Sequence, residues 1–195
     1  MNSPMRRLLL IAVLFLYSGL AVAAQDVGGI VIDYNPPFQT REDKARAWQA
    51  KMSEDLRSLI ERFEIFEAPP SLGLGEVRLL KIRYVARTFG TIDAAASETV
   101  RSIAALPGIT NVKQSTLALR VSGLDARRVS FESDRNDGKL GAEFLIIHDK
   151  RTNTAFQLQI IFAQRQGMNP FGTVDLITKR AIASSILSTV SVSRQ

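Results

Sequence analysis

The stretch GAEFLIIHDKRTNTAFQLQIIFA, residues 141–163, decides the fold that we predict for this chain. It holds two apolar runs, at 142–148 and 154–163, joined by the polar segment DKRTN. In the second run every second side chain is large and apolar, and these share one face: Phe156, Leu158, Ile160 and Phe162. A period of two is typical of a strand with a buried face, and two such runs around a polar turn predict an antiparallel hairpin.

Further hairpins are predicted on the N-terminal side of this stretch. Residues 109–121 read as extended, residues 123–125 as a turn, and residues 127–133 as the returning strand. The dipeptide Asp137-Gly138 is a strong hairpin signal. Because hairpins dominate this half of the chain, an antiparallel sheet is favoured over parallel βαβ winding.

Helices and three more strands complete the predicted architecture. Apolar residues spaced three and four apart predict amphipathic helices over residues 40–63, 91–106 and 173–189. Thr40 is the expected cap of the first helix, and Trp48, the sole tryptophan, is expected in the core beneath it. Strands are expected at 29–34 and 76–88, and residues 63–75 are expected to form a short strand followed by a Pro/Gly loop. The predicted fold class is α+β, an antiparallel sheet flanked by helices.

The N-terminus carries the pattern of a secretory leader. In RRLLLIAVLFLYSGLAVAAQ, residues 6–25, two arginines precede an apolar run that ends in small residues. We interpret residues 1–24 as a signal peptide and residues 25–195 as one α+β domain, periplasmic or secreted. The alternative is a retained anchor, but its 17 uncharged residues are at the low end of the roughly 17–25 that cross a bilayer. No later segment is apolar enough to span, so we expect no integral membrane protein after cleavage.

Composition excludes several chemistries. The chain has no cysteine and one histidine, His148, so disulfides, a thiol nucleophile and the preferred ligands of zinc are missing. No nucleophile motif accompanies His148, which reads as a polar residue at the rim of a sheet. The net charge of +6, or +4 without Arg6 and Arg7, is too small to indicate nucleic-acid binding. The sequence therefore predicts no catalytic residue, no metal and no cofactor.

One group of basic residues is a candidate binding site. If the strands that carry them are neighbours, six side chains form a cationic face: Lys81, Arg83, Arg87, Arg120, Arg127 and Arg128. Such a face suits a lipid phosphate, a glycan carboxylate or an acidic partner protein. The alternative is that long basic side chains keep the sheet edges soluble. Glu132 and Glu143 are interpreted as a charged outer sheet face.

Four segments resemble the PsbP-like family of exported proteins. They are ALPGITNV, LRVSGLDARRVSFES, the hairpin stretch quoted above and SSILSTVSV, and the resemblance covers roughly residues 77–190. The resemblance implies an α/β/α sandwich and a non-catalytic role in binding or assembly. The predicted helix over 40–63 is not expected at that place in the family, and no functional residue of the family maps onto this chain.

The expected function is that of an exported, non-enzymatic protein that binds a protein or an anionic envelope component. Two alternatives stay open at this point. One is a small hydrolase that acts on envelope material through a pair of carboxylates. The other is an immunity protein of a secretion system, which would neutralise a toxin by covering its active site.

Overall fold

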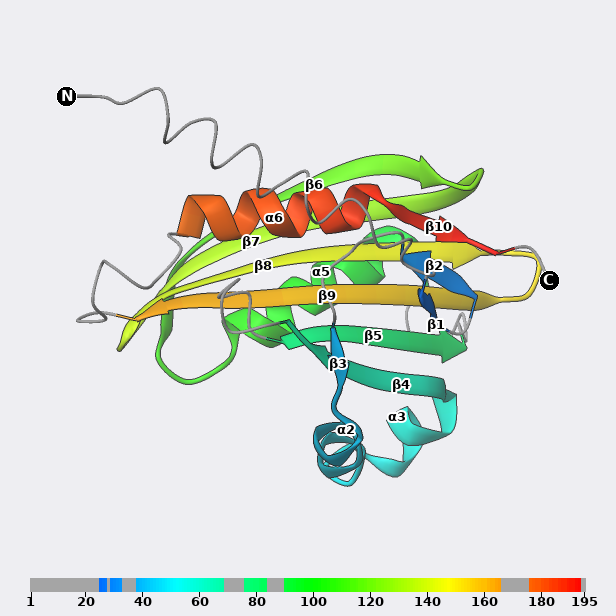
Figure 1. Cartoon of the computed structure of the whole chain (residues 1–195), viewed down its shortest axis with the longest axis horizontal. Helices are drawn as coiled ribbons and strands as arrows, with labels where there is room; N and C mark the ends of the chain where they lie inside the picture. The colour runs from blue at the N-terminus through cyan, green and yellow to red at the C-terminus, as the bar shows by residue number, and fades with distance from the viewer. Residues whose placement is uncertain are drawn as a thin grey trace, which may run out of the picture.

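A seven-stranded antiparallel sheet organises the structure, a computed structural model that describes residues 25–27, 29–32, 38–68, 76–83, 90–165 and 176–193 (Figure 1). The strands lie in the order β3-β4-β5-β9-β8-β7-β6. Their bounds are β3 Gln39–Thr40, β4 Ile60–Glu67, β5 Glu76–Arg83, β6 Ile109–Val121, β7 Leu124–Arg135, β8 Gly138–Asp149 and β9 Thr154–Arg165. A second sheet, in the order β1-β2-β10, consists of β1 Gln25–Val27, β2 Ile30–Ile32 and β10 Val190–Val192.

Helices cover both faces of the large sheet. The described helices are α2 Glu42–Gln49, α3 Glu54–Leu59, α5 Ile92–Ala104 and α6 Leu176–Ser188. In Figure 1, α6 lies in front of the sheet and α5 behind it, while α2 and α3 lie below, beside β4. The prediction of an α+β fold with an antiparallel sheet flanked by helices is therefore confirmed.

Two apolar clusters, one on each face of the sheet, form most of the core. The cluster beneath α6 includes Leu145, Ile147, Leu158, Ile160, Phe162 and Ile186. The cluster beneath α5 includes Ala96, Val100, Val129, Phe131, Phe144 and Ile146. Consecutive residues of a strand point to opposite faces, so the central strands are apolar on both sides.

The hairpin predicted from residues 141–163 is confirmed as β8 and β9. Leu145 pairs with Leu158, and Ile147 with Phe156, so the apolar residues of both strands share the α6 face. At Gly141 the backbone makes room for the ring of Phe162, because a Cβ at this position would overlap that ring. The hairpin of β6 and β7 is also confirmed, but its turn lies at Ser122 and Gly123 rather than at residues 123–125, and β7 begins at Leu124. Both turn residues have positive φ, as the mirror-image turns of tight hairpins require.

The long helix predicted over residues 40–63 is wrong. The segment instead forms α2, a turn, the short α3, and then β4, which begins at Ile60. Arg41 rather than Thr40 occupies the cap position of α2, and no side chain caps it. The error has a physical cause, because pairing with β5 stabilises residues 60–67 as a strand, and the helical spacing of the apolar residues up to Phe63 does not reveal that pairing.

The other predicted helices and strands are close to the observed ones. The helix predicted over 91–106 is α5, capped by the Thr91 hydroxyl, which accepts a hydrogen bond from the Ala94 N–H at 3.1 Å. The last helix is α6, but its predicted start at residue 173 lies outside the described residues, as do the leader, residues 1–24, and the ends of the strands predicted over 29–34 and 76–88. The short strands β1, β3 and β10 were not predicted.

Candidate functional site

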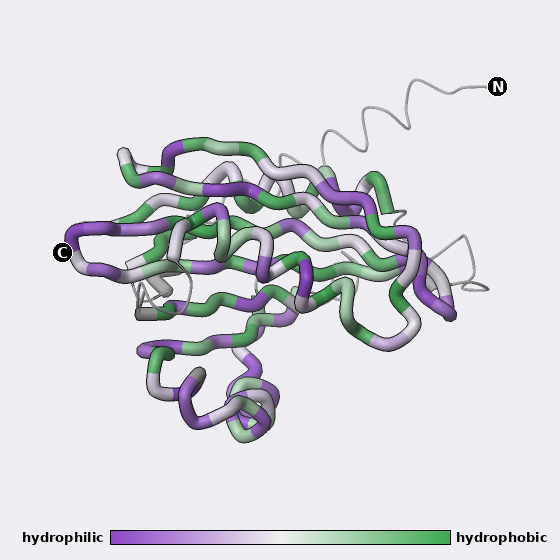
Figure 2. Tube along the Cα trace, turned by 180° about the vertical axis from the view of Figure 1, so that it is seen from behind, coloured by the Kyte–Doolittle hydropathy of each residue, from purple (hydrophilic) through white to green (hydrophobic). Residues whose placement is uncertain are grey.

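An apolar groove of about 710 Å³ lies on the α5 face of the sheet, the face that Figure 2 views. It exists because the helices cover this face incompletely. Helix α5 packs on β6, β7 and β8, and α2 and α3 pack on β4. The strip over β5 and β9 between them is the floor of the groove, formed by Arg78, Leu80, Ile82, Ala155, Gln157, Gln159 and Ile161.

One wall of the groove is the exposed side of α5 and the loop that follows it. Glu98, Thr99, Ser102 and Ile103 come from the helix, and Leu106 from the loop. Leu106 is 51% exposed. The Thr99 hydroxyl accepts a hydrogen bond from the Gln157 side chain at 3.0 Å, which joins this wall to the floor.

Trp48 and Met52 form the opposite wall. The prediction that Trp48 lies in the core is wrong, since its side chain is 42% exposed. Its ring stacks on Phe63, with 5.4 Å between ring centroids, and the Arg78 guanidinium lies 5.4 Å from the centroid of the indole ring. The indole is therefore held in one place while one side of it faces the groove.

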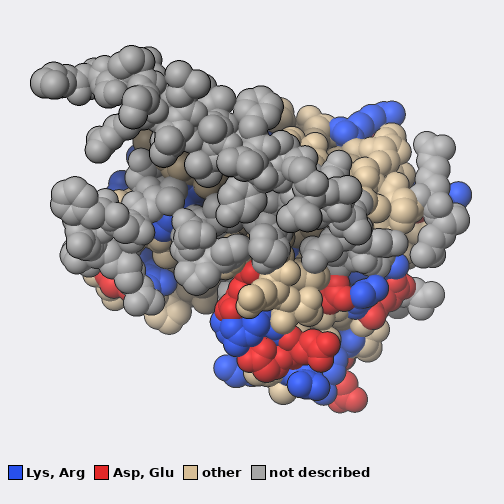
Figure 3. Space-filling model, viewed as in Figure 1, with Lys and Arg blue, Asp and Glu red and all other residues tan. Residues whose placement is uncertain are grey.

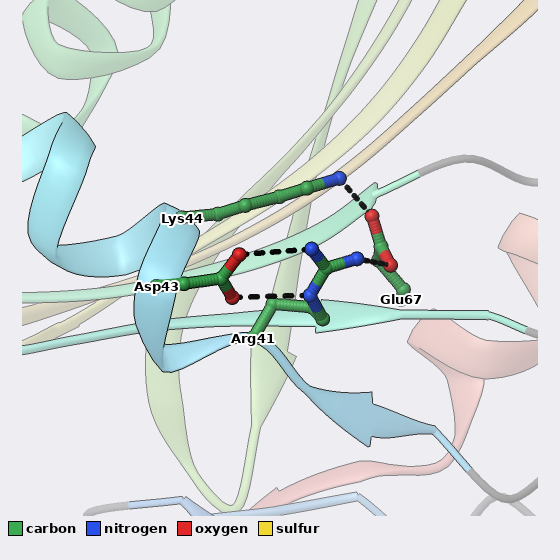
Figure 4. A network of polar contacts seen from close by, with 4 residues as sticks. All are labelled: Arg41, Asp43, Lys44 and Glu67. Carbon is green, nitrogen blue, oxygen red and sulfur yellow. Dashed lines mark hydrogen bonds and ion pairs between the residues drawn. The ribbon is translucent and has the colours of Figure 1, made fainter.

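An ionic network fixes the start of the helix that carries Trp48 (Figure 4). Arg41 donates hydrogen bonds to both carboxylate oxygens of Asp43, at 3.1 and 2.9 Å, and it also bonds Glu67 of β4, as Lys44 does. The hydrogen bond from Arg41 lowers the pKa of Asp43 to about 2 from an ordinary value of 3.8. The pKa of Glu67 is lowered chiefly by Lys44. These bonds tie α2 to β4 and so position the Trp48 wall.

The groove is suited to binding rather than to acid–base chemistry. Among the described residues that line it, Glu98 is the single carboxylate, and Glu98 pairs with Arg101. General acid–base hydrolysis needs two groups of different pKa that face one substrate. A largely apolar groove with a few polar side chains, here including Gln157 and Gln159 of the floor, is instead typical of a site that binds an apolar ligand or peptide.

A buried ionic cluster lies on the other face of the sheet, beneath α6. The Glu143 side chain is 0% exposed and accepts hydrogen bonds from Ser130 at 2.8 Å and from Arg128 Nε at 3.1 Å. Arg180 of α6 lies 3.4 Å from Glu143 and 3.1 Å from Glu132. The interpretation of Glu132 and Glu143 as a charged outer face is wrong, because α6 covers them and arginines neutralise them.

The predicted basic residues that the structure describes do not lie on one face of the sheet. Strand β5, which carries Lys81, is separated from β6 and β7 by β9 and β8. Lys81 pairs with Glu61 at 3.4 Å, Arg120 lies 3.9 Å from Asp125, and Arg127 donates to Asp93 of α5 at 2.6 Å. The side chain of Arg83, and Arg87 as a whole, lie outside the described residues.

Adjacent residues of β7 send their side chains to opposite faces, which divides the predicted site further. Arg127 points to α5 and Arg128 to the cluster beneath α6. In the view of Figure 3, acidic and basic side chains are intermixed over the lower part of the molecule, where Figure 1 places α2 and α3. A single cationic face made by these six residues is therefore not formed, and a binding role for any one of them stays a prediction.

His148 lies near the end of β8, at the rim of the sheet, as predicted. Burial lowers its pKa from the ordinary value of 6.5, and Lys150 contributes in the same direction. Within the described residues there is no group of three or more histidines and carboxylates that could hold a metal ion. The described helices also include none that is long and apolar enough to cross a membrane.

Sequence reasoning missed the groove. One signal is that three residues lining the groove have small side chains, although they come from three different elements. They are Ala95 of α5, Ala142 of β8 and Ala155 of β9. Small residues on an otherwise apolar sheet face leave space that a neighbouring helix does not fill. That signal is visible only once the order of the strands is known.

Comparisons with known proteins support the fold. No protein-family model matches the sequence, and no curated protein matches it. The structure is similar to the Ran-binding protein Mog1p of Saccharomyces cerevisiae, with a TM-score of 0.54 and 11% identity over 87% of this chain and 93% of Mog1p. A Pseudomonas aeruginosa protein of unknown function, PA94, described as a candidate regulator, has a TM-score of 0.43 and 16% identity over 69% of this chain and 84% of its own. At this identity the likeness to Mog1p shows the fold alone.

Proposed function

We propose that this chain is an exported, non-enzymatic binding protein that holds an apolar segment of a partner protein in the groove between α5 and Trp48. The observation that carries the proposal is the groove itself, with Trp48 and Leu106 exposed on its opposite walls. Exposed large apolar side chains around a concave surface are typical of interaction sites. The leader pattern of residues 1–24 supports export, and the likeness to the PsbP-like family supports a binding role.

The dimensions of the floor suit a peptide segment. From Ala155 to Ile161 the floor follows β9 for six residue steps, or about 20 Å at the usual rise of a strand. A helix of about 13 residues has the same length. An amphipathic helix lying in an apolar groove, with its polar side facing solvent, is a recurring mode of protein recognition. Mog1p is described as a protein that binds another protein, Ran, and this supports a protein partner.

The hydrolase alternative has less support. Glu132 and Glu143, the two carboxylates that share Arg180, lie beneath α6 rather than in the groove. The Glu143 side chain is 0% exposed, so a substrate cannot reach this pair from the groove. An immunity protein is a particular case of the proposed binding function, in which the bound segment belongs to a toxin.

Site-specific photo-crosslinking in the native host tests the proposal. A benzophenone amino acid is introduced at Leu106 on the groove wall and, as the matched control, at Ile177 on α6, which is 82% exposed. We expect a protein adduct from position 106, none from position 177, and loss of the adduct when Trp48→Ala is added. Equal adducts from both positions, or an adduct that Trp48→Ala leaves unchanged, would contradict binding in the groove.

The location is tested separately on the same cells. Fractionation and mass spectrometry are expected to find the chain outside the cytoplasm with an N-terminus near residue 25. A full-length chain in the cytosol would contradict export and leave the groove experiment interpretable on its own.

A further inference from the structure

Strand β6 is a long open edge of the large sheet. It has 13 residues, and within the described part of the chain it pairs with β7 alone. The strand at the other end of the sheet, β3, has only two residues. Residues 110–118 of β6 are exposed without interruption. An edge strand presents a row of main-chain N–H and C=O groups that can pair with another strand.

The middle of β6 lacks the devices that usually block such pairing. Charged residues and bulges protect natural edges. Here Lys113 and the irregularity between Thr110 and Lys113 lie at one end, and Arg120 lies at the other. The window between them, residues 114–119 (QSTLAL), contains no charge, glycine or proline. Leu117, in this window, is 61% exposed.

The turn of the β6–β7 hairpin shows which groups point outward. The two-residue turn at Ser122 and Gly123 closes on the pair Val121 and Leu124. In the alternation of an antiparallel pair, the odd-numbered residues of β6 then direct their N–H and C=O groups toward β7. The even-numbered residues, such as Thr116 and Ala118, direct theirs away from the sheet.

We infer that β6 pairs antiparallel with β6 of a second copy of this chain, with Leu117 opposite Leu117 of the second copy. In this register Thr116 faces Ala118 of the second copy, so outward-pointing main-chain groups meet. Arg120 lies opposite Gln114 and Lys113 opposite Val121, which keeps like charges apart. The exposed leucines cover one another, and the two sheets become one continuous sheet across the edge.

This inference is independent of the proposed groove function, because the groove lies on the α5 face and the pairing uses the edge. The experiment uses the mature chain. Sedimentation equilibrium at micromolar concentration is expected to give the mass of a dimer. Thr116→Pro removes an outward N–H while leaving the β7 pairing intact, so it is expected to give a monomer with an unchanged circular dichroism spectrum.

Cysteine substitution tests the register, since the chain has no other thiol. Leu117→Cys is expected to form an intermolecular disulfide readily, because directly opposed residues of a non-hydrogen-bonded pair have Cα atoms about 4.5 Å apart. Ala118→Cys is the matched control and is expected to crosslink poorly. A monomeric parent chain, a dimer that survives Thr116→Pro, or crosslinking at 118 but not at 117 would overturn the inference. So would a β6 edge that pairs only with a different protein.

Discussion

Replacing Arg128 with methionine should destabilise the protein severely, because it strips a donor from a carboxylate that has no access to water. Glu143 is 0% exposed, and its partners are Arg128, Ser130 and Arg180. Removing one partner of a buried ion pair typically costs about 3–5 kcal/mol, since the remaining charge is left poorly compensated. Arg128 also donates to Ser184 of α6, so the same change loosens the helix. We expect Arg128→Met to lose about 3 kcal/mol or more.

A double variant tests whether the loss of stability comes from a buried charge that is left uncompensated. In Glu143→Leu the two arginines keep partly exposed side chains, 27% for Arg128 and 36% for Arg180, and can turn toward water. The double variant Arg128→Met with Glu143→Leu removes both charges, so no uncompensated charge stays buried. It should therefore recover roughly half or more of the stability that Arg128→Met alone loses. The four proteins form a double-mutant cycle whose coupling energy isolates the pair.

Urea unfolding followed by far-ultraviolet circular dichroism measures these free energies, with the slope compared among variants to check that two-state behaviour holds. A loss below about 1 kcal/mol for Arg128→Met, the value typical of exposed pairs, would refute the account of the cluster. So would a double variant whose loss equals the sum of the two single losses.

Three further predictions concern the fold. Gly141→Ala should cost about 1–3 kcal/mol in urea unfolding, since the new methyl overlaps the buried Phe162 ring. Thr91→Ala should cost about 1 kcal/mol in the same assay, through loss of the α5 cap, and an unchanged midpoint would show that the cap contributes nothing. The pKa of Asp43 in the folded protein is about 2, below its ordinary value of 3.8. The bond of Asp43 with Arg41 therefore stabilises the fold fully at pH values above 3.8, and this stabilisation is lost as the pH falls toward 2. Asp43→Asn should therefore make thermal stability fall less steeply between pH 4 and 2, and an identical slope would contradict this.

The sheet was predictable where the sequence alternates, and the β8–β9 hairpin shows why. Phe156, Leu158, Ile160 and Phe162 mark a buried face directly. The opposite face was not predictable in the same way, since Gln157 is polar yet only 8% exposed. A helix from elsewhere in the chain covers it, and local periodicity contains no information about that helix.

The prediction of one long helix around Trp48 was wrong for a different reason. The apolar residues of this segment fit a helical period up to Phe63, although the structure begins a strand at Ile60. Pairing of β4 with β5 decides between helix and strand, and it is a tertiary interaction. The same dependence explains why the predicted cationic face was wrong as a single patch. Lys81 and Arg128 would be neighbours only if β5 lay beside β7, but β9 and β8 lie between these strands.

The two faces of strand β8 contribute to two different features, the groove on one side of the sheet and the ionic cluster on the other. In β8, Ala142 and Ile146 line the groove, while Glu143 and Leu145 face α6. A slip of one residue in the pairing of β8 with β7 would exchange these faces and place Glu143 in the apolar groove, away from Arg128 and Ser130. Apolar pairing alone discriminates weakly between the two registers, since β8 is apolar on both faces. The cluster therefore adds to the cost of the slipped register, while the tight turn between Arg135 and Gly138 favours the observed pairing independently. Methyl resonances of Glu143→Leu as sharp as those of the parent chain would show that the turn and the apolar core hold the register without the cluster.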